Sequence, residues 1–392
     1  MYKEVIKIGK DEKKYVHIFT SALFLSFHYY LITYINSTFL SGFVPGSLVG
    51  LLYSAGAVIN ILIVLRMPKI TKRFSLYDTL LFISVVEIIF LLILAFAVSK
   101  TLILVTYILH HAITPLALLC LNVTIEDQTK PEKLGRMRAS FLTLLSSAAV
   151  VCPLLVGSII AGGESIRSIY IFSAFFMFLF FISIWKTFKK IPNGEYKEID
   201  IPKEFGEFMA DKNIRKIGLA GFMLQFLFSW LIIFVPIFLQ KYVGLSWGDI
   251  GLLISITLLP FLLLEIPVGE IADRKTGEKE FLISGFIISA LALCLFPFIK
   301  SGSFALWTTI IFMVRVGASI VETSVEGYFY KKSKGRDELI SIFSLGSPTA
   351  YILGPLVGSV ALKYVSMEYM FPLLGILLLI GVYPLFEIED TK

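Results

Sequence analysis

The chain has 392 residues, of which 57% are hydrophobic and 16% are charged, with a formal net charge of +6. Soluble proteins carry about 25% charged residues, so this composition excludes an ordinary soluble globular protein. The charges lie in short segments between apolar runs of about 20 residues, the length that a helix needs to cross a bilayer. We therefore expect an all-α integral protein of the cell membrane.

Twelve apolar runs predict twelve transmembrane helices. The first run follows a charged N-terminus and lacks the small-residue cleavage site of a signal peptide, so it is expected to be the first span. After the sixth run, a polar and basic segment predicts a linker, with an amphipathic helix near 203–211. The chain is thereby expected to form an N-terminal six-helix bundle (1–186), a cytoplasmic linker (187–216) and a C-terminal six-helix bundle (217–392). The spans are expected near 15–35, 47–67, 77–98, 101–123, 139–161, 167–185, 217–239, 248–268, 280–299, 304–327, 339–362 and 367–386.

The distribution of basic residues predicts the orientation. Of the 35 lysines and arginines, Arg315 lies inside a span and five lie in the loops on the side away from the N-terminus, so the remaining 29 lie on the N-terminal side. Basic loops stay in the cytoplasm, so both termini are expected there. The same distribution explains the positive net charge by membrane topology, and no nucleic-acid partner is expected.

The two sets of spans align with each other at an offset of about 201 residues. The sequence Gly-Leu-Leu at 50–52 matches 251–253, and Val-Gly-Ser at 156–158 matches 357–359. Both sets begin on the same side of the membrane, so the repeat is parallel and predicts pseudo-two-fold symmetry. A parallel repeat is typical of a carrier whose two bundles move about a central site.

A charged turn with the sequence GEIADRKTGEK, at 269–279, lies between the eighth and ninth expected spans. It resembles the signature loop G-x-L-A-D-R-x-G-R-K of the major facilitator superfamily. The sequences EIPVG at 265–269 and GPLVG at 354–358 are similar to further motifs of that superfamily. In the first half, Pro68 and Lys72 replace the glycine and the aspartate of the same loop. The resemblance covers nearly the whole chain and implies the superfamily's fold of two six-helix bundles.

The signature loop is expected to act as a gate. Gly269 would let the eighth and eleventh spans approach closely. Asp273 would accept hydrogen bonds from the N-terminus of the eleventh span, Arg274 would pair with Glu326, and Glu265 would support the gate. The alternative is a solvated turn whose charges only set the topology.

Three charged residues of the tenth span share one helical face. Arg315, Glu322 and Glu326 are spaced by seven and four residues, which places them within about 40° of one another on a helix. Glu322 would pair with Arg315 in one state and release it in another, a physical basis for proton coupling. A structural salt bridge to a neighbouring span is the alternative.

The resemblance implies that spans 1, 4, 7 and 10 line the central cavity, and each of them carries polar or aromatic candidates. Neutral, hydrogen-bonded histidines and aromatic packing are the alternatives for these side chains. Glu87, in the third span, is expected to be peripheral and to pack against a polar neighbour or be protonated, rather than to have a function. No spacing indicates a metal site. The candidates for substrate binding or coupling are Arg315, Glu322, His28, His110, His111, Gln225, Trp230 and Tyr30.

These observations favour a secondary active transporter that moves a small organic solute by alternating access with proton coupling, and that exports amphipathic compounds. A facilitative or proton-linked importer of a polar or anionic nutrient is the alternative. A non-transporting membrane receptor or intramembrane enzyme is the alternative of another class, and no catalytic constellation supports it. No ATP-binding loop is found. We expect no cofactor, a monomer, and a small molecule, protons and the lipid bilayer as partners.

Overall fold

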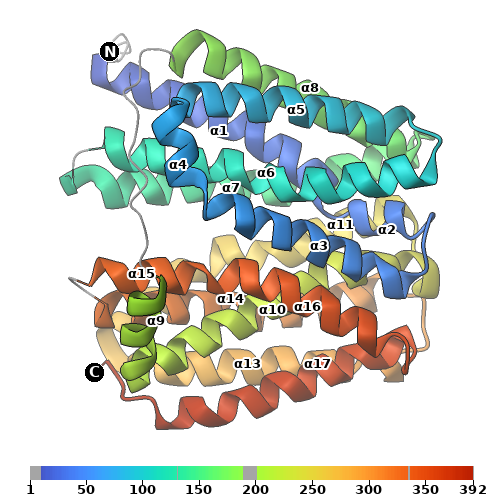
Figure 1. Ribbon diagram of the computed structural model, residues 1–392. Helices are drawn as coiled ribbons and strands as arrows, with labels where there is room; N and C mark the ends of the chain where they lie inside the picture. The colour runs from blue at the N-terminus through green and yellow to red at the C-terminus, as the bar shows by residue number, and fades with distance from the viewer. Residues whose placement is uncertain (1–9, 130, 189–200, 334–335, 392) are drawn as a thin grey trace, which may run out of the picture. The chain divides into compact units, whose positions relative to one another are not determined.

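The computed structural model describes residues 10–129, 131–188, 201–333 and 336–391. These residues form helices joined by short loops and contain no strand, so the all-α prediction is confirmed. Figure 1 follows the helices from α1, near the N-terminus, to α17, near the C-terminus. Most of the linker expected at 187–216 lies outside the described residues, and its amphipathic helix is α9 (Ile201–Ala210).

Six long helices correspond to the first six expected spans. Local capping helps to set their ends: the hydroxyl of Ser75 accepts a hydrogen bond from the backbone N–H of Asp78 at 3.0 Å and so caps α5. These helices are α1 (Lys10–Thr33), α3 (Gly46–Val64), α5 (Leu76–Phe96), α6 (Lys100–Gln128), α7 (Pro131–Ala161) and α8 (Ile166–Thr187), with the short helices α2 (Asn36–Leu40) and α4 (Met67–Arg73) between them.

The second set of spans is more interrupted. Asp211 caps the first of its helices by accepting from the backbone N–H groups of Asn213 and Ile214, each at 3.1 Å. Short π and 3₁₀ segments extend several helices, at 239–243, 272–276, 296–298 and 383–387. The helices are α10 (Lys212–Phe238), α11 (Trp247–Leu263), α12 (Glu265–Ile271), α13 (Lys279–Cys294), α14 (Phe304–Lys332), α15 (Asp337–Ser344), α16 (Gly346–Ala361) and α17 (Met367–Val382).

Eleven helical segments in the described part of the chain are long and apolar enough to cross a membrane, one fewer than expected. The difference falls on the eleventh expected span, 339–362, which the structure divides at Leu345 into α15 and α16. The 16 residues of α16 extend only about 24 Å, less than the roughly 30 Å of hydrocarbon. A multi-pass membrane protein is therefore confirmed, whereas the twelve-helix count remains a prediction.

The contacts divide the chain into two compact units, which do not coincide with the two sequence halves. The first unit contains most of α1 and α5 to α8. The second contains the C-terminal half together with α2, most of α3 and the end of α7. The first unit comprises Met1–Ile32, Leu62–Cys152 and Ser165–Lys197, and the second comprises Thr33–Ile61, Pro153–Glu164 and Glu198–Lys392.

The internal repeat appears in the second unit as a matched pair of close helix contacts. A side chain at Gly50 on α3 would overlap the carbonyl oxygen of Pro355 on α16. A side chain at Gly251 on α11 would overlap the carbonyl oxygen of Pro153 on α7. Each glycine lies where two backbones nearly touch, the geometry that small residues permit in membrane helices. The repeat detected in the sequence therefore has a structural counterpart.

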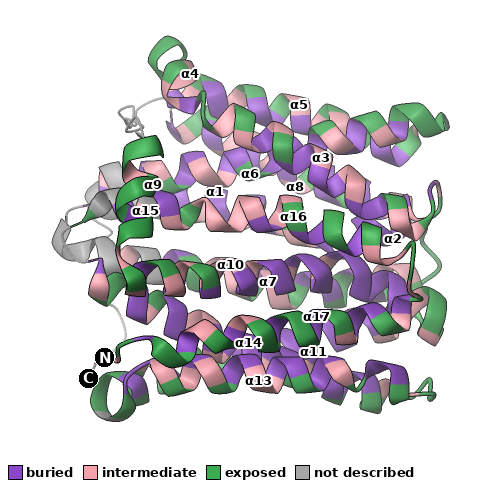
Figure 2. Cartoon of the chain, turned by 60° about the horizontal axis from the view of Figure 1, so that its bottom comes forward, coloured by how far each residue is buried: buried purple, intermediate pink, exposed green. Residues whose placement is uncertain are grey.

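The exposed surface of the helices is rich in large apolar side chains, as a lipid-facing surface requires. Among them, Phe82 is 70% exposed and Ile266 is 72% exposed. In contrast, α9 is exposed along most of its length and rich in charged residues (Figure 2). It is held by its buried Phe208, whose ring lies against Gly218 of α10.

Candidate functional site

A buried cluster of ionisable side chains lies in the first unit. It joins His28 of α1, Glu87 of α5 and His110 of α6, whose side chains are 0%, 0% and 2% exposed. His110 Nδ1 lies 2.5 Å from Glu87 Oε1, and His28 Nε2 lies 3.3 Å from the same oxygen. Two imidazoles therefore share one carboxylate oxygen in an interior closed to solvent.

Two hydroxyl groups complete the cluster. Thr114 Oγ1 donates to Glu87 Oε1 at 2.7 Å, and Ser173 Oγ of α8 lies 2.8 Å from His28 Nδ1. Glu87 Oε2 is buried and has no hydrogen-bond partner among the described residues. The carboxylate is thus satisfied on one oxygen only, although burial of a charge normally demands full pairing.

Sequence reasoning placed His28 and His110 among the candidates but did not connect them to Glu87. It expected Glu87 to pack against polar neighbours, and the structure supplies two histidines and a threonine hydroxyl. The available signal is periodicity: Leu80, Glu87 and Leu91 are fully buried on α5 at helical spacing. A carboxylate in register with buried leucines indicates a position inside the unit.

The other two candidates of the first unit lie outside this cluster. The ring of His111 stacks on Tyr107 at a centroid distance of 5.9 Å. Because adjacent residues of a helix face different directions, His110 pairs with Glu87 while His111 stacks on Tyr107. Tyr30 makes an edge-to-face contact with Tyr29 at 5.1 Å.

In the second unit, the central charge is Arg315 of α14, which is 6% exposed. Its Nη2 donates to the Tyr34 hydroxyl at 3.4 Å, and its guanidinium carbon lies 5.7 Å from the ring centre of Phe228 and 5.9 Å from that of Phe261. Its Nε has no partner among the described residues. No ion pair joins Arg315 to Glu322, so the pairing of these two residues remains a prediction.

The two candidates of α10 fasten that helix to α16. Trp230, which is 2% exposed, donates its indole N–H to the carbonyl of Gly354 at 2.7 Å. The Gln225 side-chain oxygen accepts from the Ser347 hydroxyl at 3.1 Å. These contacts position α16 beside the helix that carries Phe228.

The charged turn makes a different network from the one expected. Asp273 Oδ1 lies 2.7 Å from Lys331 Nζ, at the end of α14, and not at the N-terminus of the eleventh span. Lys331 also pairs with Glu278, which is 2% exposed. Arg274 is exposed and forms no ion pair with Glu326, so that expected pairing is absent from the structure.

The two remaining gating candidates lie close to α14. A side chain at Gly269 would meet the Thr323 methyl group at 3.6 Å, an ordinary contact, so glycine is not required there for close approach. Glu265 begins α12, which packs against α14. The gating candidates therefore gather around the end of α14, with Lys331 as a member that the motif did not indicate.

The end of the chain folds over this turn. Thr391 donates to Glu278, and the carbonyl of Glu389 accepts from the Tyr328 hydroxyl at 2.7 Å. Gly277 has a left-handed backbone (φ 80°), and a side chain there would overlap the carboxylate of Asp390. The final residues thus pack directly against the second half of the charged turn.

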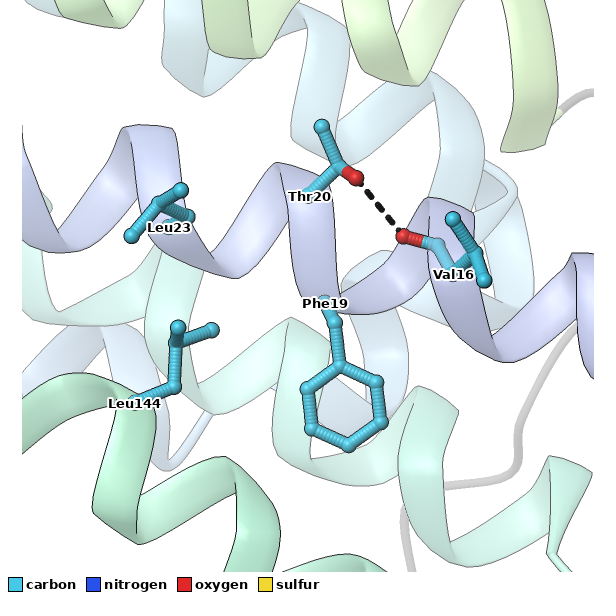
Figure 3. A pocket seen from close by; sticks show the side chains of 5 residues that line it. All are labelled: Val16, Phe19, Thr20, Leu23 and Leu144. Carbon is cyan, nitrogen blue, oxygen red and sulfur yellow. Dashed lines mark hydrogen bonds between the residues drawn. The ribbon is translucent and has the colours of Figure 1, made fainter. Parts of the chain in front are cut away.

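A hollow of about 430 Å³ lies on the first unit, between α1 and α7. Figure 3 shows its lining, which is apolar apart from the Thr20 hydroxyl, and that hydroxyl donates to the Val16 carbonyl at 2.8 Å. An apolar groove between two membrane helices contains none of the charged groups described above, so it is not a candidate for the polar site.

Helices long and apolar enough to cross a membrane, with charged side chains buried among them, define a multi-pass membrane protein. A family model of the Major Facilitator Superfamily matches residues 17–214 and 217–392, so the chain belongs to that superfamily. A search of the curated proteins found no significant match.

Solved structures of peptide transporters share the fold. The POT family transporter PepTSo has a TM-score of 0.75 and 11% identity, with 95% of this chain and 97% of that chain covered. An auto-inhibited POT family peptide transporter gives 0.77 and 11%, with 97% and 98% covered. A POT peptide transporter in complex with sulfate gives 0.74 and 13%, with 96% and 94% covered. At this identity the likeness concerns the fold.

Proposed function

We propose that the protein is a proton-driven secondary transporter of small organic anions with an apolar body. Its two halves, 1–186 and 217–392, would form bundles of six spans with both termini in the cytoplasm and would alternate access to a central site. The repeat and the matched glycine contacts at Gly50 and Gly251 support this architecture. On this reading α15 and α16 together supply the eleventh span.

The observation that carries the proposal is the environment of Arg315. A buried guanidinium with no carboxylate partner among the described residues is costly, because its charge is left uncompensated. An anionic group of a solute would neutralise it and accept from its Nε, which now has no described partner. The rings of Phe228 and Phe261 beside it would contact the apolar part of the same solute.

The environment of Arg315 favours one of the solutes considered from the sequence. A cationic amphipath would be repelled by Arg315, whereas an anionic amphipath satisfies both its charge and the rings around it. The receptor and enzyme alternatives receive no support, since the family is one of transporters.

The test uses purified protein in proteoliposomes and a panel of solutes that do not cross lipid unaided. Aromatic and aliphatic sulfonates serve as permanently ionised anions, with cationic and neutral analogues of the same size. We expect saturable flux of the sulfonates, accelerated by an imposed pH gradient and about 10- to 100-fold slower at low sulfonate concentration in Arg315→Ala. Saturable flux of the cations that survives in Arg315→Ala would contradict the proposal, as would flux that is indifferent to the gradient.

A further inference from the structure

We propose that His28, Glu87 and His110 form the proton-binding site of the transporter, and that the proton they hold is the one that drives transport. The coupling role rests on the proposed function, whereas proton binding by the cluster does not. Each contact within the cluster needs one hydrogen between its two polar atoms.

The hydroxyl of Ser173 determines the tautomer of His28. Ser173 Oγ lies 3.0 Å from the carbonyl oxygen of His28, which can only accept, so the single hydroxyl hydrogen points there. His28 Nδ1, at 2.8 Å from the same Oγ, must then donate. A neutral imidazole has one N–H, so His28 Nε2 carries a lone pair toward Glu87 Oε1 at 3.3 Å.

Two lone pairs that face each other in a buried site repel, unless a proton lies between them. An added proton, on either His28 or Glu87, converts this contact into a hydrogen bond. The contact of His110 Nδ1 with Glu87 Oε1 at 2.5 Å already needs one hydrogen, which neutral His110 supplies. The single hydrogen of the Thr114 hydroxyl faces two acceptors, Glu87 Oε1 and the carbonyl oxygen of His110, each at 2.7 Å, and is shared between them. The cluster therefore has a place for one further proton, between α1 and α5.

Among the described residues, the ion pairs of this cluster join Glu87 to His28 and to His110. The helices that pack against α5 are α6, α8 and α4. Arg167 of α8 donates to the carbonyls of Ala95 and Ala97, at the far end of α5. The described titratable and charged groups on the elements around Glu87 are His17, His28, Tyr29 and Tyr30 of α1, Tyr77 and Asp78 of α5, Lys100, Tyr107, His110, His111 and Cys120 of α6, Arg167, Tyr170 and Lys186 of α8, and Lys69, Lys72 and Arg73 of α4.

The enclosure of the cluster suits a coupling site. Its three side chains are 0–2% exposed, so a proton exchanges only when the surrounding helices move. A gradient does work through a carrier only if proton release is tied to such a movement. The cluster belongs to the first unit and Arg315 to the second, so proton and solute would bind to different parts of the chain.

The experiment measures proton uptake by the purified protein in detergent, followed with a pH-indicator dye on acidification through neutrality. The probe is the proton itself, and no solute is added. We expect Glu87→Gln to take up about one proton per molecule less than the wild type, because the place for the further proton, between His28 Nε2 and Glu87 Oε1, is lost. Glu280→Gln, which removes an exposed acid near the start of α13, should retain the wild-type uptake.

Thr114→Val is the second variant, for use also if Glu87→Gln does not fold. It removes the hydroxyl that donates to Glu87 and keeps the size of the side chain. Without that hydrogen bond the ionised carboxylate is less stable, so half-complete uptake should move to higher pH. Wild-type uptake in Glu87→Gln, or an unshifted curve in Thr114→Val, would overturn the proposal and leave the cluster with a structural role.

The two proposals fail separately. If no solute shows gradient-driven flux but the uptake depends on Glu87, the proton site stands and the transport proposal fails. If sulfonates are driven by the gradient and Glu87→Gln leaves both uptake and driven flux unchanged, transport stands and the proton site is elsewhere. Loss of driven accumulation in Glu87→Gln with retained solute exchange would support both.

Discussion

Gly50 and Gly251 occupy equivalent places in the two halves of the chain, and each faces a proline carbonyl of another helix, Pro355 for the first and Pro153 for the second. A methyl group at either glycine would overlap that carbonyl. The repeat is retained where backbones meet. The repeat is not retained in the signature motif, where Pro68 and Lys72 replace the residues equivalent to Gly269 and Asp273.

The glycine contacts predict the effect of the smallest possible substitution. Gly50→Ala and Gly251→Ala should each destabilise the protein by about 1–3 kcal/mol, because the new methyl group must displace rigid backbone. Thermal unfolding in detergent, followed by tryptophan fluorescence, measures the change. Gly46→Ala is the matched control, since nothing lies within 4 Å of a side chain there. A melting temperature equal to that of the control would contradict the close contact.

Arg315 should matter for binding more than for folding. Arg315→Ala removes a charge-assisted hydrogen bond worth about 1.5–3 kcal/mol, so the affinity for an anionic solute should fall about 10- to 100-fold. Its thermal stability should stay the same or rise, because a buried charge without a carboxylate partner is lost. Thr309→Ala, an exposed change on the same helix, is the control. Unaltered sulfonate affinity in Arg315→Ala would remove this residue from the site.

The network around Lys331 predicts unequal effects of its members. Asp273→Asn removes one of two acids that pair with Lys331 and should cost about 0.2–1 kcal/mol, since Asp273 is 64% exposed. Lys331→Gln leaves the carboxylate of Glu278, which is 2% exposed, without its cation. The free energy of unfolding should fall by about 3–5 kcal/mol. Thermal unfolding measures both changes.

The same variants test the gate. Thiol probes added from the cytoplasmic side should label single cysteines in the cavity faster in Lys331→Gln than in Asp273→Asn. Lys300→Gln, which breaks an exposed pair with Glu368 on another loop, should change neither labelling nor stability. Equal labelling in all three variants would show that the charged turn does not hold the cytoplasmic side closed.

The cap of α10 predicts a dependence of stability on pH. Burial works to raise the pKa of Asp211, but the backbone N–H of Ile214 and the Arg336 guanidinium, 3.1 Å away, outweigh it and lower the pKa below its usual value. A lowered folded-state pKa means that the stabilisation is present above the unfolded value, about 3.9, and is lost as the pH falls through the folded value.

In Asp211→Asn the loss of melting temperature on acidification through this range should be smaller than in the wild type. Asparagine still caps a helix, so the variant should remain folded at neutral pH. Arg336→Gln removes one of the two causes and should give an intermediate slope. Identical slopes in all three proteins would show that this carboxylate does not contribute to acid stability.

Much of the fold could be predicted from the sequence because hydrophobic length and basic loops act locally. The spans and their repeat follow from such patterns, and so does α9. The sequence did not lead us to expect the break at Leu345 within 339–362. Gly346 and Pro348 follow it directly, and both residue types interrupt helices, so a local signal was present.

The candidate site was predictable only in part. Helical spacing places Arg315 and Glu322 on one face, but it does not show that Arg315 contacts Tyr34, which is distant in the sequence. Likewise, Lys331 lies outside the signature motif, although it pairs with Asp273 inside it. Tertiary packing determines such partners, and the residue pattern of one segment does not predict them.

The burial of Glu87 has a consequence for the order in which the protein is made. A carboxylate at the centre of a membrane helix opposes insertion by about 2.5–3.5 kcal/mol. The span that carries it, Leu76–Phe96, has the highest mean hydropathy of the eleven candidates, 2.8, which offsets that cost. His28 emerges from the ribosome before Glu87, and His110 emerges after it. The third span therefore inserts into the bilayer through its own hydrophobicity. Its polar contacts are completed only after the fourth span has been made.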